Sequence, residues 1–159
     1  VYITLYHWDL PAHLDEQYGG WLNQTAMVQY FAEYAEICFQ LFSDRVKYFI
    51  TFNEPWVQAQ LAYGVGVNAP GRCTLCKHGN SATEPYIVGH TQLLAHAAAV
   101  QIFRTKYQSK TGGRIGITLN SDWCEPMTDS AKDKEAAQRY QEFFLGWFAD
   151  PGLLQDTAT

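Results

Sequence analysis

The sequence predicts an α/β fold in which parallel strands alternate with helices. Three strand-like segments, at residues 1–8, 46–52 and 114–120, are each followed by a helical pattern. This alternation is typical of a parallel sheet covered by helices. The composition agrees, because hydrophobic residues make up 47% of the 159 residues and charged residues 17%. Such a chain can form a buried core and is not a disordered one.

The first strand is followed by a turn-rich stretch at residues 15–20 and then by a helix at residues 25–42. Asn23 or Thr25 is a suitable N-cap for this helix. Apolar residues recur along it at steps of three and four, which predicts one buried face and one face toward water. The expected buried face consists of Val28, Phe31, Ala35, Cys38 and Phe42.

The second strand runs directly into Asn53-Glu54-Pro55, where the proline ends strand pairing and a carboxylate lies at the strand's carboxyl end. A long loop follows at residues 64–83, rich in Gly, Pro and Asn. Pro85 then opens a helix that we expect to run to about Tyr107.

The third strand is followed by a predicted helix at residues 130–148, and the chain from Gly152 on is expected to be an unstructured tail. The first residues, in contrast, already resemble a buried strand. We therefore expect the sequence to be a piece of a larger fold.

Three such units fit either a doubly wound sheet or part of a (β/α)₈ barrel. Two observations favour the barrel. No glycine-rich phosphate turn follows the first strand, and each strand ends in polar or aromatic residues. In a barrel these strand ends converge on one rim. A complete barrel takes about 250 residues, so the prediction is a partial barrel.

Charge and hydropathy exclude several kinds of partner. Eleven Lys and Arg against 16 Asp and Glu give a formal charge of -5, and no basic cluster is present, so binding to nucleic acid is not expected. No apolar run approaches the ~20 residues that span a bilayer. We expect no membrane segment, no metal and no cofactor.

The residues at the strand ends suit a sugar ligand. Glu54 has aromatic neighbours, and apolar surroundings favour the protonated form of a carboxyl group, which can then donate a proton. Asn53 offers an amide, His7 a switchable donor or acceptor, and Trp8 a flat apolar face. Each residue alone is more commonly a solvated acid or a packing residue. Their coincidence at successive strand ends supports the functional interpretation.

Four segments together resemble the family 1 glycoside hydrolases, the β-glucosidase family. They are Leu5-Tyr6-His7-Trp8-Asp9-Leu10-Pro11, Tyr18-Gly19-Gly20-Trp21-Leu22, Thr51-Phe52-Asn53-Glu54-Pro55 and Gly116-Ile117-Thr118-Leu119-Asn120. The stretch Gly71-Arg72-Cys73-Thr74-Leu75-Cys76 looks most like plant members. The resemblance covers residues 1–150 as part of a single barrel domain, and residues 151–159 form a tail that departs from the family pattern.

The resemblance implies a barrel of which this chain supplies about the third to fifth strands. It also implies hydrolysis of β-D-glucosides, or related β-glycosides, by a retaining mechanism, with Glu54 as the general acid/base. Further roles are implied residue by residue. Asn53 would bind the sugar 2-hydroxyl, His7 and Trp8 would contact the glycone, and Trp56 and Asp122 would lie toward the aglycone.

The family's nucleophile is a second Glu in a Thr-Glu-Asn-Gly-like motif, and no such motif occurs in these 159 residues. We therefore expect this chain alone to be inactive. Two alternatives remain open: a non-catalytic relative that binds sugar or protein, and a transglycosidase. The presence of Glu54 favours a catalytic protein, because a relative without this chemistry could carry another residue there.

Cys73 and Cys76 form a C-x-x-C pair, which admits a redox pair, half a zinc site or a structural disulfide. No second pair completes a zinc site, and the two residues lie within a long loop, so we expect a disulfide. The plant-type resemblance implies the same disulfide, and a disulfide indicates an oxidising, secretory compartment. The resemblance also implies an extracellular, cell-wall or vacuolar location. Asn23-Gln24-Thr25 is a glycosylation sequon, although helix capping explains this Asn equally well.

Overall fold

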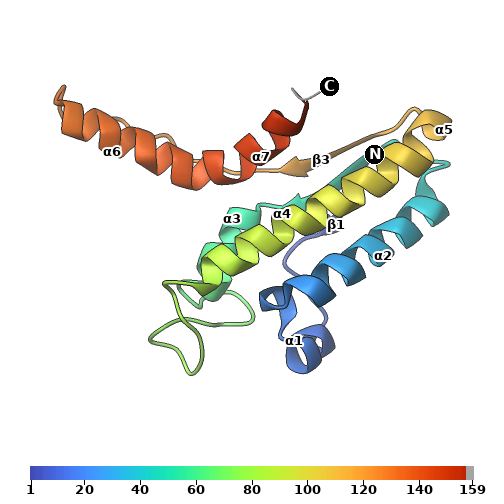
Figure 1. Cartoon of the computed structure of the whole chain (residues 1–159), viewed down its shortest axis with the longest axis horizontal. Helices are drawn as coiled ribbons and strands as arrows, with labels where there is room; N and C mark the ends of the chain where they lie inside the picture. The colour runs from blue at the N-terminus through green and yellow to red at the C-terminus, as the bar shows by residue number, and fades with distance from the viewer. Residues whose placement is uncertain (157–159) are drawn as a thin grey trace. The chain divides into compact units, whose positions relative to one another are not determined.

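The computed structural model describes residues 1–156 of the chain, with side chains to Gly152. The chain divides into two compact units, Val1–Thr118 and the part from Leu119 onward. The first unit holds three parallel strands in the order β1-β2-β3, which are β1 (Tyr2–Tyr6), β2 (Tyr48–Asn53) and β3 (Arg114–Thr118) (Figure 1). The predicted α/β fold is confirmed.

Strand β1 forms one edge of the sheet, and β2 lies at its centre. The first residues form the expected strand, which is buried at Leu5 and Tyr6, while Val1 and Tyr2 at its start are 90% and 69% exposed. The pairing of β2 with β3 shifts register between Ile50 and Asn53, which is the end that leads to Glu54.

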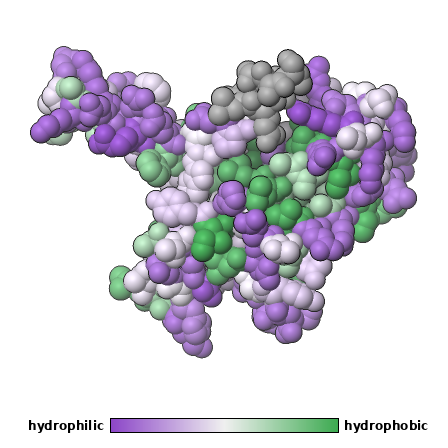
Figure 2. Space-filling view, in the orientation of Figure 1, coloured by the Kyte–Doolittle hydropathy of each residue, from purple (hydrophilic) through white to green (hydrophobic). Residues whose placement is uncertain are grey.

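Two long helices, α2 (Gln24–Phe42) and α4 (Glu84–Phe103), pack against each other and cover one face of the sheet (Figure 1). The ring of Phe49 on β2 contacts both helices, with centroids 5.0 Å from Phe39 and 5.7 Å from Phe103. In the view of Figure 2, hydrophobic residues gather along the course that α4 takes in Figure 1. The core of this unit therefore lies between the sheet and the helix pair.

Helix α2 begins where the sequence predicts it. The Asn23 side-chain oxygen accepts a hydrogen bond from the Ala26 N–H at 3.2 Å, and its amide group donates to the Tyr18 carbonyl at 3.0 Å. The capping interpretation is confirmed, while glycosylation of Asn23 stays a prediction. The buried face includes Met27 and Phe39, whereas the sequence analysis placed Val28 and Phe42 there.

A short helix, α1 (Ala12–Tyr18), occupies the stretch that was expected to be a turn, which corrects the sequence analysis. It ends at Gly19, with a φ of 83°, and Gly20 follows with a φ of 52°. A side chain at Gly20 would place its Cβ 2.5 Å from Asp15 Oδ1. Two glycines are therefore required here, because the chain must turn tightly before it buries Trp21 completely.

After β2 the chain forms α3 (Pro55–Val57) and a π-helical turn (Gln58–Ala62), and then the long loop. The loop holds the expected disulfide, in which Cys73 Sγ and Cys76 Sγ lie 2.07 Å apart. It is also tied to the start of α4, because the Arg72 guanidinium donates two hydrogen bonds to the Glu84 carboxylate at 2.9 and 2.7 Å. Bidentate pairs of this kind are among the stronger polar contacts in proteins.

Two short segments separate α4 from β3. A π-helical turn (Arg104–Gln108) follows α4 directly, and α5 (Ser109–Thr111) comes next. The helix predicted to run to about Tyr107 is therefore α-helical only as far as Phe103. Gly112, with a φ of 63°, then ends the helical run before β3.

The second unit contains α6 (Ala131–Gln141), a π-helical turn (Glu142–Gly146) and α7 (Trp147–Asp156). The Ser130 hydroxyl caps α6 by accepting from the Asp133 N–H at 3.2 Å. The expected unstructured tail was wrong as far as Asp156, because extending an existing helix needs no new nucleation. Residues 157–159 of that tail lie outside the described residues. None of the helices in the described part of the chain is long and apolar enough to cross a membrane.

Candidate active site

At the carboxyl ends of two neighbouring strands, one residue has a left-handed backbone conformation with a positive φ. Trp8 follows β1 with a φ of 67°, and Glu54 follows β2 with a φ of 46°. Within residues 1–156 these are the two non-glycine residues with a positive φ. Such conformations are uncommon outside glycine and concentrate at functional sites. Both unusual residues are ones that the sequence analysis singled out.

Glu54 is held by its backbone on two sides. Its N–H donates to the carbonyl of Thr118, the last residue of β3, at 2.8 Å, and its own carbonyl accepts from the Val57 N–H at 3.0 Å. Glu54 is thus the N-cap of α3, and Pro55 occupies the first helical position, where the missing N–H does no harm. Strand β3 and helix α3 together fix the backbone position of Glu54, from which its half-buried side chain extends.

A hydrogen bond joins the two strand ends directly. The indole Nε1–H of Trp8 donates to the backbone carbonyl of Asn53 at 2.8 Å. The exposed His7 ring meets the Trp8 ring edge-on, with centroids 4.9 Å apart, and the His7 N–H donates to Asp9 Oδ1 at 3.0 Å. The structure therefore places His7, Trp8, Asn53 and Glu54 at adjoining strand ends, and their roles stay predictions.

The two residues expected to contact the aglycone come from different parts of the chain. Trp56 is half-buried on α3, two residues beyond Glu54. Asp122 belongs to the second unit, where its carboxylate accepts from the Tyr140 hydroxyl at 3.3 Å and its carbonyl accepts from Gln141 Nε2 at 2.7 Å. Their assignment to the aglycone also stays a prediction.

A polar contact behind β2 was not foreseen from the sequence. Thr51, three residues before Glu54, donates its hydroxyl to the Gly116 carbonyl at 3.2 Å, and the same oxygen lies 2.7 Å from His96 Nδ1 on α4. Because the hydroxyl proton is used toward Gly116, this network assigns the Nδ1–H tautomer to His96. One side chain thus links β2 to both β3 and α4, and a polar pair at these two distant positions has no local sequence signal.

Burial lowers the pKa of His96 to about 4, with a smaller contribution from the Arg104 charge. The ordinary value in an unfolded chain is about 6.5. Because the folded pKa is the lower one, stability is fully present above about pH 6.5 and is lost as the pH falls toward 4. We expect the unfolding free energy of the full-length protein to decrease as the pH is lowered from 6.5 to 4. His96 contributes at most roughly 1.4 kcal/mol per pH unit to this decrease.

Urea unfolding at a series of pH values tests this. His96→Asn, which removes the titrating ring and keeps an amide N–H near the Nδ1 position, should flatten the slope between pH 6.5 and 4. His90→Asn, an exposed histidine on the same helix, is the matched control and should leave it unchanged. Equal slopes of unfolding free energy against pH in wild type and His96→Asn would contradict the lowered pKa of His96.

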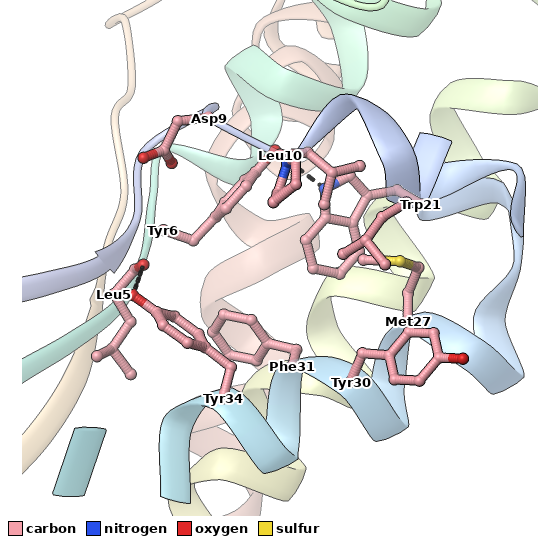
Figure 3. A pocket seen from close by; sticks show the side chains of 11 residues that line it. Leu5, Tyr6, Asp9, Leu10, Trp21, Met27, Tyr30, Phe31 and Tyr34 are labelled. Carbon is pink, nitrogen blue, oxygen red and sulfur yellow. Dashed lines mark hydrogen bonds between the residues drawn. The ribbon is translucent and has the colours of Figure 1, made fainter. Parts of the chain in front are cut away.

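An apolar hollow of about 340 Å³ lies beside the strand ends, between the end of β1 and α2 (Figure 3). Trp21 closes part of it and donates its indole N–H to the Tyr6 hydroxyl at 3.0 Å. Burial raises the pKa of Tyr6 well above its ordinary value, so this hydroxyl stays protonated. His7, Trp8, Asn53 and Glu54 do not line this hollow, which is therefore distinct from the strand-end site.

Parallel βα units with an Asn-Glu pair at a central strand end are the arrangement expected of a barrel glycosidase. The chain belongs to glycosyl hydrolase family 1, whose sequence model matches residues 1–157. Among curated relatives it is 54% identical to β-glucosidase 40 of Arabidopsis thaliana and 53% identical to β-glucosidase 34 of Oryza sativa. Both alignments cover 98% of this chain and 31% of the relative, so the chain spans about a third of these proteins.

Solved structures agree with this assignment. The rice Os3BGlu6 β-glucosidase superposes with a TM-score of 0.91 at 54% identity, covering 94% of this chain and 32% of that one. A β-glucosidase from the fungus Humicola insolens, solved in complex with glucose, gives a TM-score of 0.91 at 47% identity with the same coverage. The predicted family and the predicted partial (β/α)₈ barrel are confirmed.

Proposed function

We propose that the full-length protein containing this chain hydrolyses the O-glycosidic bonds of β-D-glucosides, or of related β-glycosides, with retention of configuration. The observation that carries the proposal is the position of Glu54. It follows β2 in an uncommon backbone conformation, anchored to β3 and next to Asn53. Similar proteins of the same family are named β-glucosidases, which supports this substrate class.

In this proposal Glu54 acts twice. It first protonates the leaving glycosidic oxygen, and it then deprotonates the water that releases the sugar from the covalent intermediate. Asn53 binds the sugar 2-hydroxyl, while His7 and Trp8 contact the glycone. Their adjoining positions support these roles, since Trp8 is hydrogen-bonded to the Asn53 backbone. Trp56 and Asp122 would lie toward the aglycone.

The retaining reaction needs a second carboxyl group, about 5 Å from the first. Among the glutamates after Glu54, Glu84 is 8% exposed and is bound by Arg72, whose guanidinium lowers the pKa of that carboxyl. A carboxylate committed to an arginine in this way is a poor nucleophile. We propose that the nucleophile comes from a part of the full-length barrel beyond these residues.

This chain, made alone, is expected to release no 4-nitrophenol from 4-nitrophenyl β-D-glucoside above the buffer background. One carboxyl group can neither form nor resolve the covalent intermediate. The measurement is an absorbance assay of the purified 159-residue chain, with a complete family 1 β-glucosidase as positive control. Turnover well above background would show that a second carboxyl group within the chain suffices.

We also propose that the protein passes through the secretory pathway to an extracellular, cell-wall or vacuolar location. The Cys73–Cys76 disulfide supports this, because such bonds persist in oxidising compartments. A glycan at Asn23 would be a direct marker of that route. Mass spectrometry of tryptic peptides from the native protein would detect it.

A further inference from the structure

The last residues of β2 contain a β-bulge just before Glu54. Ile50 pairs with Gly116, and the next residues to pair are Asn53 and Thr118. This is three steps along β2 but two along β3, so β2 holds one extra residue. An extra residue interrupts the regular alternation of side chains along a strand. Bulges of this kind are frequent next to active sites, where they change the direction of the side chains that follow.

Two neighbouring side chains show the effect of the bulge. Thr51 contacts His96 on α4, and the next residue, Phe52, stacks on Phe31 of α2. Both helices cover the same face of the sheet (Figure 1), so two consecutive side chains lie on one face. A regular strand would place them on opposite faces. The bulge therefore changes the face toward which the following residues, beginning with Asn53, are directed.

Hydrogen bonds to β3 hold the bulge at both of its ends. At the first end the Thr51 hydroxyl donates to the Gly116 carbonyl at 3.2 Å. At the second end the Glu54 N–H donates to the Thr118 carbonyl at 2.8 Å. Thr51 is completely buried, so bulk water does not compete for its bond. Its side chain thus fixes β2 against β3 where the register shifts.

His96 determines the direction in which the Thr51 hydroxyl points. Its Nδ1 lies 2.7 Å from Thr51 Oγ1, and the Nδ1–H tautomer donates to that oxygen. The oxygen therefore accepts one hydrogen bond from α4 and donates one to β3, so it cannot rotate without losing one of them. Losing such a bond is unfavourable in a buried place, because no water replaces the partner. The pair connects α4 to the bulge in one defined geometry.

We propose that Thr51, held by His96, is a positioning residue for Glu54. Its side chain lies on the helix-covered face of the sheet, so it acts on the reaction indirectly, by holding the bulge that directs Asn53 and the acid/base. The inference rests on the proposed function, because it takes the catalytic role of Glu54 from there. A displacement of a reacting group by about 1 Å is enough to cost a large part of the rate.

Thr51→Val in the full-length protein tests this, because it keeps the shape of the side chain and removes the hydroxyl. We expect kcat/KM for an alkyl β-D-glucoside to fall by about 10- to 100-fold, since the acid is misplaced. The loss should be much smaller for a dinitrophenyl β-D-glucoside, whose leaving group needs no proton. Thr51→Ser keeps the hydroxyl and should restore both rates. His96→Leu, which removes the other partner, should show the same dependence on the leaving group as Thr51→Val.

Thr91→Val is the matched control. Thr91 is also completely buried, but its hydroxyl donates to the Ile87 carbonyl within α4 at 2.8 Å, so the change should leave both rates as in wild type. Melting temperatures identify any variant that fails to fold. A purely structural role of Thr51 predicts equal losses for both glucosides. Equal losses, an unchanged rate in Thr51→Val, or a Thr51→Ser variant as slow as Thr51→Val would each overturn the proposal.

Crystal structures of the full-length wild type and of Thr51→Val separate this proposal from the proposed function. We expect the Glu54 carboxyl group and the pairing of Asn53 with Thr118 to be displaced in the variant. An inactive wild type together with this displacement would refute the proposed function alone. An unmoved Glu54 carboxyl group in Thr51→Val would refute the positioning role, even if the wild type hydrolyses both glucosides.

Discussion

Glu54→Gln in the full-length protein is expected to lower kcat/KM for an alkyl β-D-glucoside by about 10²–10⁴-fold, the usual contribution of a general acid/base. Glutamine keeps the size of the side chain but can neither donate nor take up the required proton. The backbone that anchors residue 54 to Thr118 and α3 does not involve the carboxyl group, so the fold should be retained. Steady-state kinetics on purified protein provides the measurement.

The leaving group makes this test specific. An alkyl alcohol needs protonation as it departs, whereas a dinitrophenolate does not, so Glu54→Gln should slow glycosyl transfer to the enzyme far less for a dinitrophenyl glucoside. Added azide, a nucleophile that needs no general base, should then speed turnover of that substrate. Glu135→Gln, an exposed glutamate on α6, is the matched control and should behave as wild type. An equal loss for both leaving groups would argue against an acid role.

Phe52→Ala is expected to reduce the unfolding free energy by about 3–5 kcal/mol, the usual cost of deleting a buried aromatic ring. Phe52 is 0% exposed, and its ring stacks on Phe31 with centroids 4.4 Å apart. It also meets Tyr6 and Trp21 edge-on at 5.5 and 5.4 Å. The ring therefore joins the ends of β1 and β2 to α2.

Urea unfolding of the full-length protein, monitored by tryptophan fluorescence, measures this effect. Phe52→Leu keeps most of the volume and should cost less than about 1.5 kcal/mol. Because Phe52 lies two residues before Glu54, the alanine variant should also lose activity under conditions in which it is still folded. Similar urea midpoints for Phe52→Ala and Phe52→Leu would contradict this prediction. They would show that neighbouring residues fill the space left by the ring and that this aromatic cluster contributes little to stability.

The sequence was most informative where local patterns and strand ends coincide. The steps of three and four between Phe31, Ala35 and Cys38 predicted α2, and Asn23 was correctly placed at its start. Asn53-Glu54-Pro55 marked the end of β2, because proline cannot continue the pairing. These features depend on neighbours in the chain, which a sequence displays directly.

The elements that were mispredicted are those in which local composition misleads. The polar residues of α1 resemble a turn, yet Gly19 and Gly20 end a helix there and lead Trp21 into the core. The segment after Gly152 lacks a strong periodic pattern, and it is helical as far as Asp156 because the preceding helix continues into it. In both places the neighbouring structure outweighs intrinsic preference.

By itself the sequence determined the fold class, the order of the βα units and the residues at the two strand ends. Only the tertiary structure decided how those ends are joined, because the bonds from Trp8 to Asn53 and from Thr51 to His96 each span 45 residues. It alone also revealed that the polar side chains of Gln58 and Tyr63 are buried, at 2% and 0% exposed. Burial and hydrogen bonding between distant segments depend on how the chain packs, and the periodicity of residues along the sequence does not determine them.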